Sequence, residues 1–281
     1  MDRFEFHSNA VGFDPINLRW LCEAASLVSA GDLVAARRTL EGWGLPRFVW
    51  FSQRETEAFL AGNANLILIA FRGLGGEGLF QRLLREPQRF VETPLGRVDE
   101  FFWREFTWIR ANLAQTVRAF RDAKQPVWLT GHGLGGALAV LAAGWLASEQ
   151  VFPVQGLATF GAPRVGHREY AVNFHQLMDA ESRSFQRSSM RVVNHIDPIS
   201  QLPPTSRDYA AIGHKVHFDE HGEMIPCEGT GFERMAELVS AAKIAVDRAL
   251  DGQPVDLSDH AISEYLRHTR HLAHSAAREP R

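Results

Sequence analysis

The chain has 281 residues, of which 45% are hydrophobic and 22% charged, a composition typical of a soluble globular protein with a large core. Its net charge is −3, whereas nucleic-acid-binding proteins usually carry an excess of basic residues, so no nucleic-acid partner is expected. Only Cys22 and Cys227 occur, which excludes a disulfide framework and a thiolate metal site and suits a reducing compartment. Both are expected to be small buried hydrophobes.

The first residues give no targeting signal. Met1–Glu5 is charged and lacks the apolar core of a secretory signal. The longest apolar run, Ala137–Ala147, is too short to span a bilayer and predicts a buried helix. A cytoplasmic location is therefore the default expectation, and export without an N-terminal signal stays open.

Hydrophobic periodicity predicts alternating helices and strands. Apolar spacing predicts a helix over residues 16–43, and the apolar run at 65–71 predicts a strand buried on both faces. The later elements are a helix at 102–120, a strand at 126–130, a helix at 135–147, strands at 154–160 and 190–194, a hairpin pairing 215–218 with 223–225, a helix at 232–250 and a last helix with Ser258 as N-cap. This order predicts an α/β fold with a mostly parallel sheet covered on both faces, forming one domain over residues 1–267, followed by a basic tail at 268–281.

The most informative motif is Gly131-His132-Gly133-Leu134-Gly135, between the strand at 126–130 and the helix at 135–147. A strand, a tight turn and a small-residue helix are the context of the nucleophile elbow G-x-S-x-G. In that motif the central serine supplies the attacking hydroxyl, and the following N–H points at the oxyanion. Here Gly133 occupies the nucleophile position, so the elbow is kept without its attacking oxygen.

An acid and a histidine follow in the order that a hydrolase triad requires. Asp197 comes directly after the strand at 190–194, which places its carboxylate at the same sheet edge as the elbow. His260 lies on a loop at the start of the last helix and could fold back to the elbow. Taken singly, an Asp before Pro is most often a turn former and a lone His a surface residue. Their order and spacing from Gly133 make Asp197 and His260 the candidate acid and base.

Five segments resemble the class 3 (fungal lipase-like) family of α/β-hydrolases. They are Ile69–Gly73, Thr130–Leu138, Thr159–Gly166, Arg191–Pro204 and His260 with its neighbours, and the resemblance extends over roughly residues 16–267. It implies an α/β-hydrolase fold, triacylglycerol, phospholipid or related acyl-ester chemistry, and no metal or organic cofactor. It assigns Gly133 to the nucleophile site, Asp197 to the acid, His260 to the base, and the N–H groups of Leu74 and Leu134 to the oxyanion hole. It also makes residues 75–90 a candidate lid, although an ordinary core-covering helix explains their spacing equally well.

Three departures from that family pattern bear on activity. Gly133 replaces the serine, Leu74 stands where a hydroxyl residue is usual, and Val98-Asp99-Glu100-Phe101 replaces a His-x-Gly-Phe stretch. Three scattered changes favour gradual loss of catalysis over a single engineered substitution. No second G-x-S-x-G occurs, and Ser200 follows Asp197 too closely to act as its nucleophile.

Three functions remain open from the sequence. The first is a lipase- or esterase-family protein of lipid metabolism that binds acylglycerol or phospholipid esters, or a small ester, and is impaired or silent because of Gly133. The second is an active serine lipase or carboxylesterase whose serine was replaced in this sequence. The third is a non-catalytic interaction protein that binds a protein partner at the former active-site cleft or at the face of the candidate lid.

Two histidine groups are better explained without a metal. His214, His217 and His221 suggest metal ligands, but strand geometry puts His214 and His217 on opposite faces. His268, His271 and His274 recur every three residues in the arginine-containing tail. That tail is expected to be solvated, and transient contact of its arginines with an anionic membrane surface is a weaker alternative.

Overall fold

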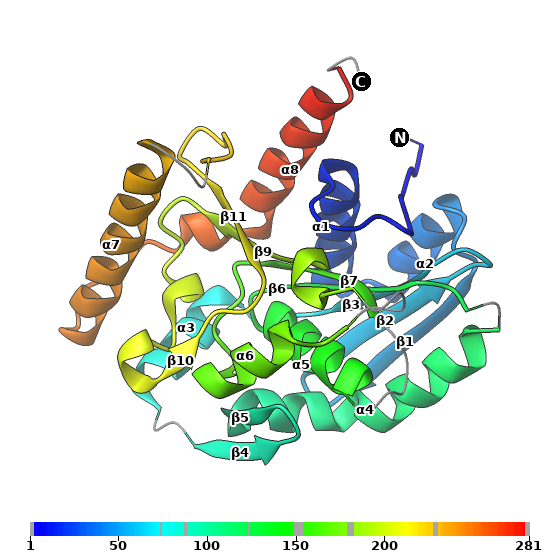
Figure 1. Ribbon diagram of the computed structural model, residues 1–281, viewed down its shortest axis with the longest axis horizontal. Helices are drawn as coiled ribbons and strands as arrows, with labels where there is room; N and C mark the ends of the chain where they lie inside the picture. Colours follow the sequence, from blue (N-terminus) through cyan, green and yellow to red (C-terminus); the bar gives the residue numbers. More distant parts are fainter. Residues whose placement is uncertain are drawn as a thin grey trace.

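A seven-stranded, mostly parallel sheet forms the centre of the computed structural model, which describes residues 3–73, 75–86, 89–122, 124–148, 154–178, 183–226 and 230–278 (Figure 1). The first three strands pair antiparallel and the remaining pairs are parallel. Because parallel strands need long crossovers, helices cover both faces. The strand order is β1 (Arg47–Gln53), β2 (Thr56–Gly62), β3 (Ile67–Phe71), β6 (Val127–His132), β7 (Val154–Phe160), β9 (Ser189–Asn194) and β11 (His214–Phe218).

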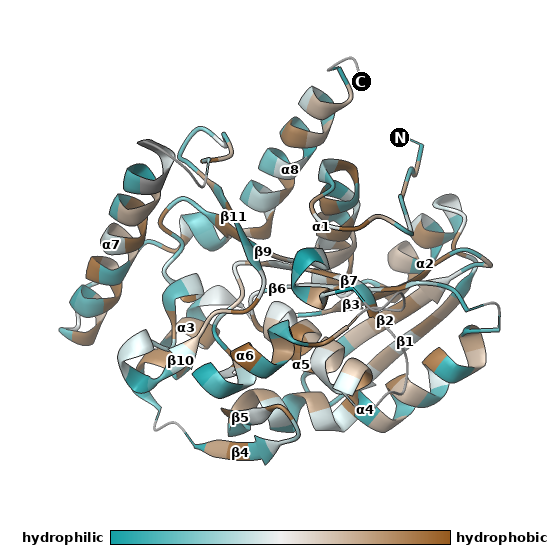
Figure 2. Ribbon diagram, viewed as in Figure 1, coloured by the Kyte–Doolittle hydropathy of each residue, from teal (hydrophilic) through white to brown (hydrophobic). Residues whose placement is uncertain are grey.

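Two hydrophobic clusters lie on opposite faces of this sheet. One joins the strands to α1 (Pro15–Ser29) and α8 (Ile262–Ala276), and the other joins them to α4 (Glu100–Phe120) and α5 (Leu134–Ser148). In Figure 2 the strands β1 to β3 are mainly brown, whereas the outer helices α7 (Thr230–Leu250) and α8 carry both colours. The sheet is thus apolar on both sides and the helices are amphipathic, as the sequence predicts.

The helix predicted over residues 16–43 is two helices, α1 and α2 (Leu33–Gly42). Gly31 takes a φ of +69° and Asp32 caps α2 by accepting hydrogen bonds from the N–H groups of Val34 and Ala35. A glycine in the left-handed region followed by an aspartate N-cap ends one helix and starts the next. Apolar periodicity continued across this break and concealed it.

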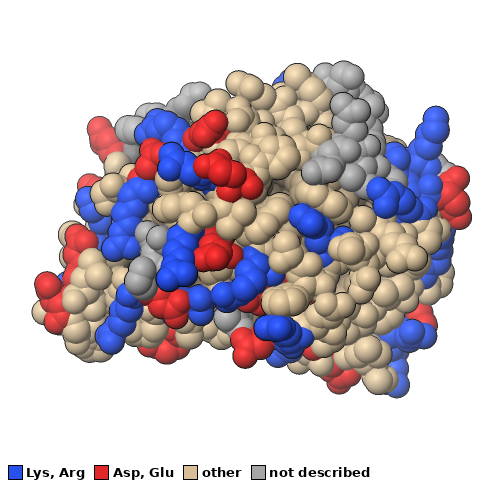
Figure 3. Space-filling view, turned by 90° about the horizontal axis from the view of Figure 1, so that it is seen from below, with Lys and Arg blue, Asp and Glu red and all other residues tan. Residues whose placement is uncertain are grey.

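Charged side chains are unevenly distributed on the underside of the molecule. Figure 3 shows positive and negative groups gathered on one half of this face and mainly uncharged residues on the other half. Among the ion pairs of the chain are Arg82 with Glu86 at 2.8 Å and Arg97 with Glu92 at 3.9 Å. Charges of opposite sign lie at short range in these pairs.

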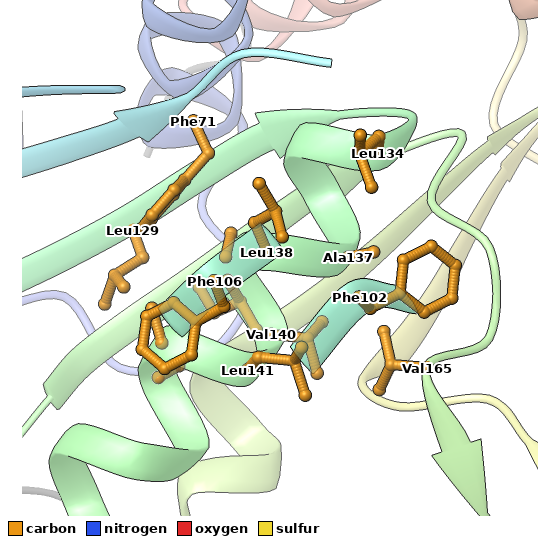
Figure 4. Packing of buried hydrophobic residues seen from close by; sticks show 14 of the residues in the cluster. Phe71, Phe102, Phe106, Leu129, Leu134, Ala137, Leu138, Val140, Leu141 and Val165 are labelled. Atoms are coloured by element: carbon orange, nitrogen blue, oxygen red, sulfur yellow. The ribbon is translucent and has the colours of Figure 1, made fainter. Parts of the chain in front are cut away.

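Helix α5 is buried between the sheet and α4. Figure 4 shows Phe106 of α4 near Leu141 of α5 and Leu129 of β6, and Phe102 of α4 near Ala137 of α5, all within one buried cluster. The many alanines and glycines of α5 let it approach the strands closely. This packing fixes the start of α5, and with it the turn from β6, against the carboxyl end of the sheet.

Shorter elements surround this core. The predicted hairpin is only partly present, because β11 pairs with β9 in parallel and residues 219–225 return to form a single bridge between Phe218 and Met224. A second sheet has the order β10 (Tyr209–Ala210), β8 (Gly166–His167), β5 (Gly96–Asp99) and β4 (Phe90–Thr93). The remaining helices are α3 (Gly76–Arg85), α6 (Arg168–His175), η1 (Phe185–Ser188), η2 (Ile199–Gln201), η3 (Thr205–Arg207) and η4 (Ser258–His260).

The prediction of a solvated tail from residue 268 is wrong as far as residue 276. Helix α8 begins at Ile262, without a Ser258 cap, and continues to Ala276 with His268, Thr269 and Ala273 buried. The periodic apolar positions of this segment pack on α1. The charged residues between them favoured the prediction of a solvated tail. Cys22 is buried as predicted, and Cys227 lies outside the described residues. Within the ranges described above, no helix is long and apolar enough to cross a membrane.

Candidate active site

The glycine motif forms a sharp turn between β6 and α5. Gly133 takes a φ of +54°, and its N–H donates to the carbonyl oxygen of Phe160 at 2.9 Å. A Cβ on Gly135 would lie 2.1 Å from the carbonyl oxygen of Phe71, so this position requires glycine. The strand, turn and helix predicted for the elbow are therefore confirmed, with Gly133 at the apex.

Asp197 and His260 meet beside this turn, as their order in the sequence predicts. Asp197 follows β9 and His260 ends η4, and His260 Nδ1 donates to Asp197 Oδ2 at 2.9 Å. The two residues are 0% and 3% exposed, respectively, so the pair is shielded from solvent. Burial alone would raise the pKa of the Asp197 carboxyl, but the His260 ring and the hydroxyl of Tyr265 outweigh it and lower that pKa.

The second ring nitrogen of His260 faces Gly133. A Cβ placed on Gly133 would lie 3.0 Å from His260 Nε2 and 3.4 Å from Cε1. Nε2 is buried and has no hydrogen-bond partner among the described residues. In a serine triad this nitrogen accepts the proton of the nucleophile, so the base is aimed at the position where a serine hydroxyl would stand.

Two further side chains hold the histidine loop, and sequence reasoning missed their roles. His132 Nε2 donates to the carbonyl oxygen of His260 at 2.6 Å, and the two rings lie 4.4 Å apart. Burial and the neighbouring His260 lower the pKa of His132 to about 3, so its ring is neutral at pH 7. Asp259 accepts from His195 Nδ1 at 2.9 Å and from the N–H of Ile196 at 3.3 Å.

Tyr265 of α8 supports the acid. Its hydroxyl donates to Asp197 Oδ2 at 2.6 Å and accepts from the N–H of Asn194 at 3.1 Å. The N–H of Ile199 donates to the other carboxylate oxygen, Oδ1, at 2.9 Å. Asp197 therefore accepts three hydrogen bonds, which is why a fully buried carboxylate is stable here.

We expect Tyr265→Phe to lower the free energy of unfolding by about 1–3 kcal/mol, because it leaves a buried carboxylate and the Asn194 N–H with one partner fewer. Urea unfolding at pH 7.5 measures this change. Tyr170→Phe is the matched control, since Tyr170 is 2% exposed and its hydroxyl makes no hydrogen bond to any described residue. Equal losses in the two variants would show that the Asp197 bond contributes nothing specific.

One of the two predicted oxyanion donors can be placed. The Leu134 N–H is the first of α5, directly after the elbow, as expected for a donor at a helix N-terminus. Leu74 lies outside the described residues. Its neighbour Gly73 approaches the elbow, because a Cβ there would be 3.4 Å from the Leu134 nitrogen and 2.6 Å from the carbonyl oxygen of His132. Leu134 is therefore positioned as the resemblance implies, and the role of both donors stays a prediction.

Helix α3, within the predicted lid segment 75–90, covers the site. Leu79 Cδ2 would lie 3.7 Å from a Cβ on Gly133, and a Cβ on Gly76 would lie 3.0 Å from His260 Cδ2. Leu79, Phe80, Leu83 and Leu84 of α3 are all buried. The helix is thus packed directly on the elbow and the histidine, and its movement as a lid stays a prediction.

The histidine groups and the C-terminal arginines lie apart from this site. His217 is 1% exposed, His214 is exposed, and His221 lies on the following turn. Among the residues with a defined position, no cluster of His, Cys, Asp or Glu could hold a metal ion. Two of the arginines near the C-terminus form ion pairs, Arg267 with Glu264 and Arg270 with Glu23, each at 2.6 Å.

A mostly parallel sheet with a nucleophile elbow after β6, an acid after β9 and a histidine before the last helix defines an α/β-hydrolase. The family model "Lipase (class 3)" matches residues 68–207, which include the elbow and the acid. The chain belongs to the class 3 lipase family. This confirms the resemblance seen in the sequence.

Curated relatives match over a limited part of their length. The chain is 37% identical over 105 residues to the secreted mono- and diacylglycerol lipase 1 of Fusarium solani, covering 36% of this chain and 27% of that protein. It is 34% identical over 96 residues to lipase A of Sodiomyces alcalophilus, covering 31% and 22%. The matched segments thus span less than a third of these relatives.

Solved structures support the same fold. The Rhizomucor miehei lipase propeptide complex aligns with a TM-score of 0.60 and 21% identity, covering 80% of this chain and 75% of that one. The mono- and diacylglycerol lipase of Aspergillus oryzae aligns with a TM-score of 0.59 and 19% identity, covering 73% and 80%. At these identities the likeness establishes the fold, and the chemistry has to be argued from the site.

Proposed function

We propose that this protein binds acylglycerol or phospholipid esters at the site beneath α3 and hydrolyses them slowly at most. The observation that carries the proposal is the pairing of an intact Asp197–His260 dyad with a glycine at the nucleophile position. The names of the relatives, which include a mono- and diacylglycerol lipase and the chloroplastic phospholipase A(1) DAD1 of Arabidopsis thaliana, support this ligand class.

The absence of a hydroxyl at Gly133 removes the acyl-enzyme step. Glycine offers no oxygen to attack the ester carbonyl, so His260 has no serine proton to accept. In a comparable triad, removal of the serine lowers turnover by about 10⁶ and leaves roughly 10³–10⁴ over water from the oxyanion hole and binding. Slow hydrolysis therefore requires that His260 Nε2 deprotonate a water molecule, a general-base effect worth about 10²–10⁴.

The buried α3 face supports an apolar ligand. Leu79 lies over the elbow and is 0% exposed, and Phe80 and Leu83 continue the same helix face. If α3 is displaced, these side chains and the elbow become a continuous apolar surface next to His260. An acyl chain would replace the contacts that α3 makes with the site, whereas a polar ligand would not.

The first test separates slow hydrolysis from binding alone. We expect the protein to hydrolyse p-nitrophenyl butyrate well below the 1–10³ s⁻¹ common for enzymes, and His260→Ala to reduce that rate further. A residual rate that His260→Ala leaves unchanged means that the site only binds. Turnover in the range of ordinary serine lipases would refute the proposal.

The second test measures binding without chemistry. A dialkylglycerol ether has the shape of a diacylglycerol and cannot be hydrolysed, so calorimetric titration with micelles of this analogue reports binding alone. We expect Leu79→Asp to weaken binding about tenfold or more, because it places a charge on the apolar face of α3. Glu77→Gln on the exposed side of α3 is the control. No binding by the unaltered protein would favour the interaction-protein alternative.

A further inference from the structure

The two edges of the central sheet differ in how they are protected. At one edge, residues 219–225 fold back along β11, where Ile225 N–H donates to the carbonyl oxygen of His217 at 2.8 Å. At the other edge, β1 pairs only with β2 (Figure 1). Within the described chain, no backbone segment hydrogen-bonds to the outer side of β1. Its outward N–H and C=O groups are therefore available to another strand.

Strand β1 lacks the usual protection of an exposed edge. It is seven residues long, and its sequence, Arg-Phe-Val-Trp-Phe-Ser-Gln, carries a charge only at Arg47. It contains no proline, and its register with β2 runs without a bulge from Arg47 to Gln53. Natural proteins commonly block such edges with inward lysines, prolines or bulges, so an open apolar edge indicates a pairing surface.

A groove runs along this edge and is uncharged throughout. It has a volume of about 340 Å³ and lies between residues 49–53 of β1 and Asn112, Gln115 and Thr116 of α4. An uncharged groove fits an uncharged extended strand better than a charged one, because a charge placed there would lose water without gaining a partner. The segment 48–53 of β1 is itself such a strand.

We propose that β1 pairs antiparallel with β1 of a second copy of this chain, about a two-fold axis at Trp50. This register places Val49 opposite Phe51, Phe48 opposite Ser52, and Arg47 opposite Gln53, so no like charges face each other. The ends that meet carry both signs, with Arg47 and Asp122 paired at 3.0 Å at one end and Arg54 followed by Glu55 at the other. The two sheets then form one continuous sheet, and the half-buried Trp50 is covered by its own copy.

Sedimentation velocity over a range of protein concentrations tests the assembly. We expect the unaltered chain to shift from monomer to dimer with increasing concentration, and Trp50→Lys to remain monomeric because two cations then face each other at the axis. Ile244→Lys is the matched control, since Ile244 is 57% exposed on α7, and it should dimerise like the parent. Circular dichroism verifies that both variants are folded.

Cross-linking tests the register, including the case in which Trp50→Lys impairs folding. A short bifunctional thiol reagent should join two copies of Trp50→Cys, because the two positions are opposite each other at the axis. In Ser52→Cys the two thiols are offset by four residues, roughly 13 Å along the strands, so we expect about tenfold less product. Peptide mapping distinguishes this product from links through Cys22 or Cys227.

Three results would overturn the proposal. The chain stays monomeric at all concentrations, it forms a dimer that Trp50→Lys leaves intact, or Ser52→Cys cross-links as well as Trp50→Cys. The first of these results includes a monomer that binds an extended peptide of another protein at β1.

Discussion

Gly133→Ser should raise ester hydrolysis by about 10²-fold or more over the unaltered protein, because it returns the attacking hydroxyl to a site whose base and acid are in place. His260 Nε2 already points at this position, with no partner among the described residues. The full factor of about 10⁶ is not expected. A Cβ at this position lies 3.0 Å from Nε2, so the His260 ring has to move back before a hydroxyl fits between them.

The measurement has two independent readouts. Hydrolysis of p-nitrophenyl butyrate gives the rate, and a fluorophosphonate probe, which reacts only with an activated serine, gives covalent labelling at residue 133. Gly133→Ala is the matched control, since it adds the same Cβ and the same crowding without the oxygen. A gain in Gly133→Ala, or labelling that persists when His260→Ala is added to Gly133→Ser, would contradict the proposed roles. If neither readout changes, other parts of the catalytic machinery have also been lost, as Leu74 and the Asp99–Glu100 stretch indicate.

Both substitutions are also expected to lower the free energy of unfolding by about 1–3 kcal/mol, because a non-glycine residue at a φ of +54° is strained. Active members of a fold with this elbow have to tolerate that strain for their serine. We therefore expect the present chain to be more stable than its Gly133→Ser variant. Urea unfolding of the parent, Gly133→Ala and Gly133→Ser gives this difference directly.

The elbow could be predicted because its signals are local. Close approach of the backbone requires glycine at position 135, and the small residues that follow let α5 pack on the sheet, so the motif itself specifies the turn. Asp197 and His260 are 63 residues apart and could be paired only through the order in which the fold arranges its strands. The role of Tyr265 could not be foreseen, because it depends on how α8 packs beside β9.

The hydrophobic pattern does not predict strands β1 and β2, for a different reason. Their two-residue connection is Arg54-Glu55, and Arg54 takes a φ of +56°. Tight hairpin turns usually have Asn, Asp or Gly at such positions, so the sequence of this turn does not predict a hairpin. The same hairpin supplies the open edge of the sheet. The surface proposed for assembly thus lies in a segment to which the sequence pattern assigns no structure.

Acid should destabilise this protein strongly between pH 6.5 and 5, because burial lowers the pKa of several histidines in the folded state. The pKa is lowered most for His132 and His217, and it is also lowered for His175 and His268. Burial lowers the pKa of His217 to about 4, with Lys215 and Arg191 contributing, and that of His132 is about 3. The unfolded chain binds protons at these residues with a pKa near 6.5. Since the unfolded state binds more protons below that pH, stability is full above pH 6.5 and falls as the pH decreases.

The expected loss is large enough to measure with confidence. At pH 5 His132 and His217 each lower the free energy of unfolding by about 2 kcal/mol. Together they remove about 4 kcal/mol from a typical total of 5–15 kcal/mol. Asp197 acts in the same direction, but its lowered carboxyl pKa makes its contribution disappear only below the ordinary range near pH 4. Urea unfolding at half-unit steps from pH 7.5 to 5 gives the slope.

One substitution identifies the buried histidine as the cause. His217→Gln keeps an N–H that can donate to the carbonyl oxygen of His195, as His217 Nε2 does at 2.8 Å, but it cannot take up a proton. It should therefore reduce the loss of stability between pH 6.5 and 5 by about 2 kcal/mol while changing stability at pH 7.5 much less. His214→Gln, on the same strand but exposed, should leave the slope unchanged. Equal slopes in the parent and in His217→Gln would place the acid sensitivity elsewhere. A reduced slope would show that part of the acid sensitivity arises from a buried histidine outside the candidate active site.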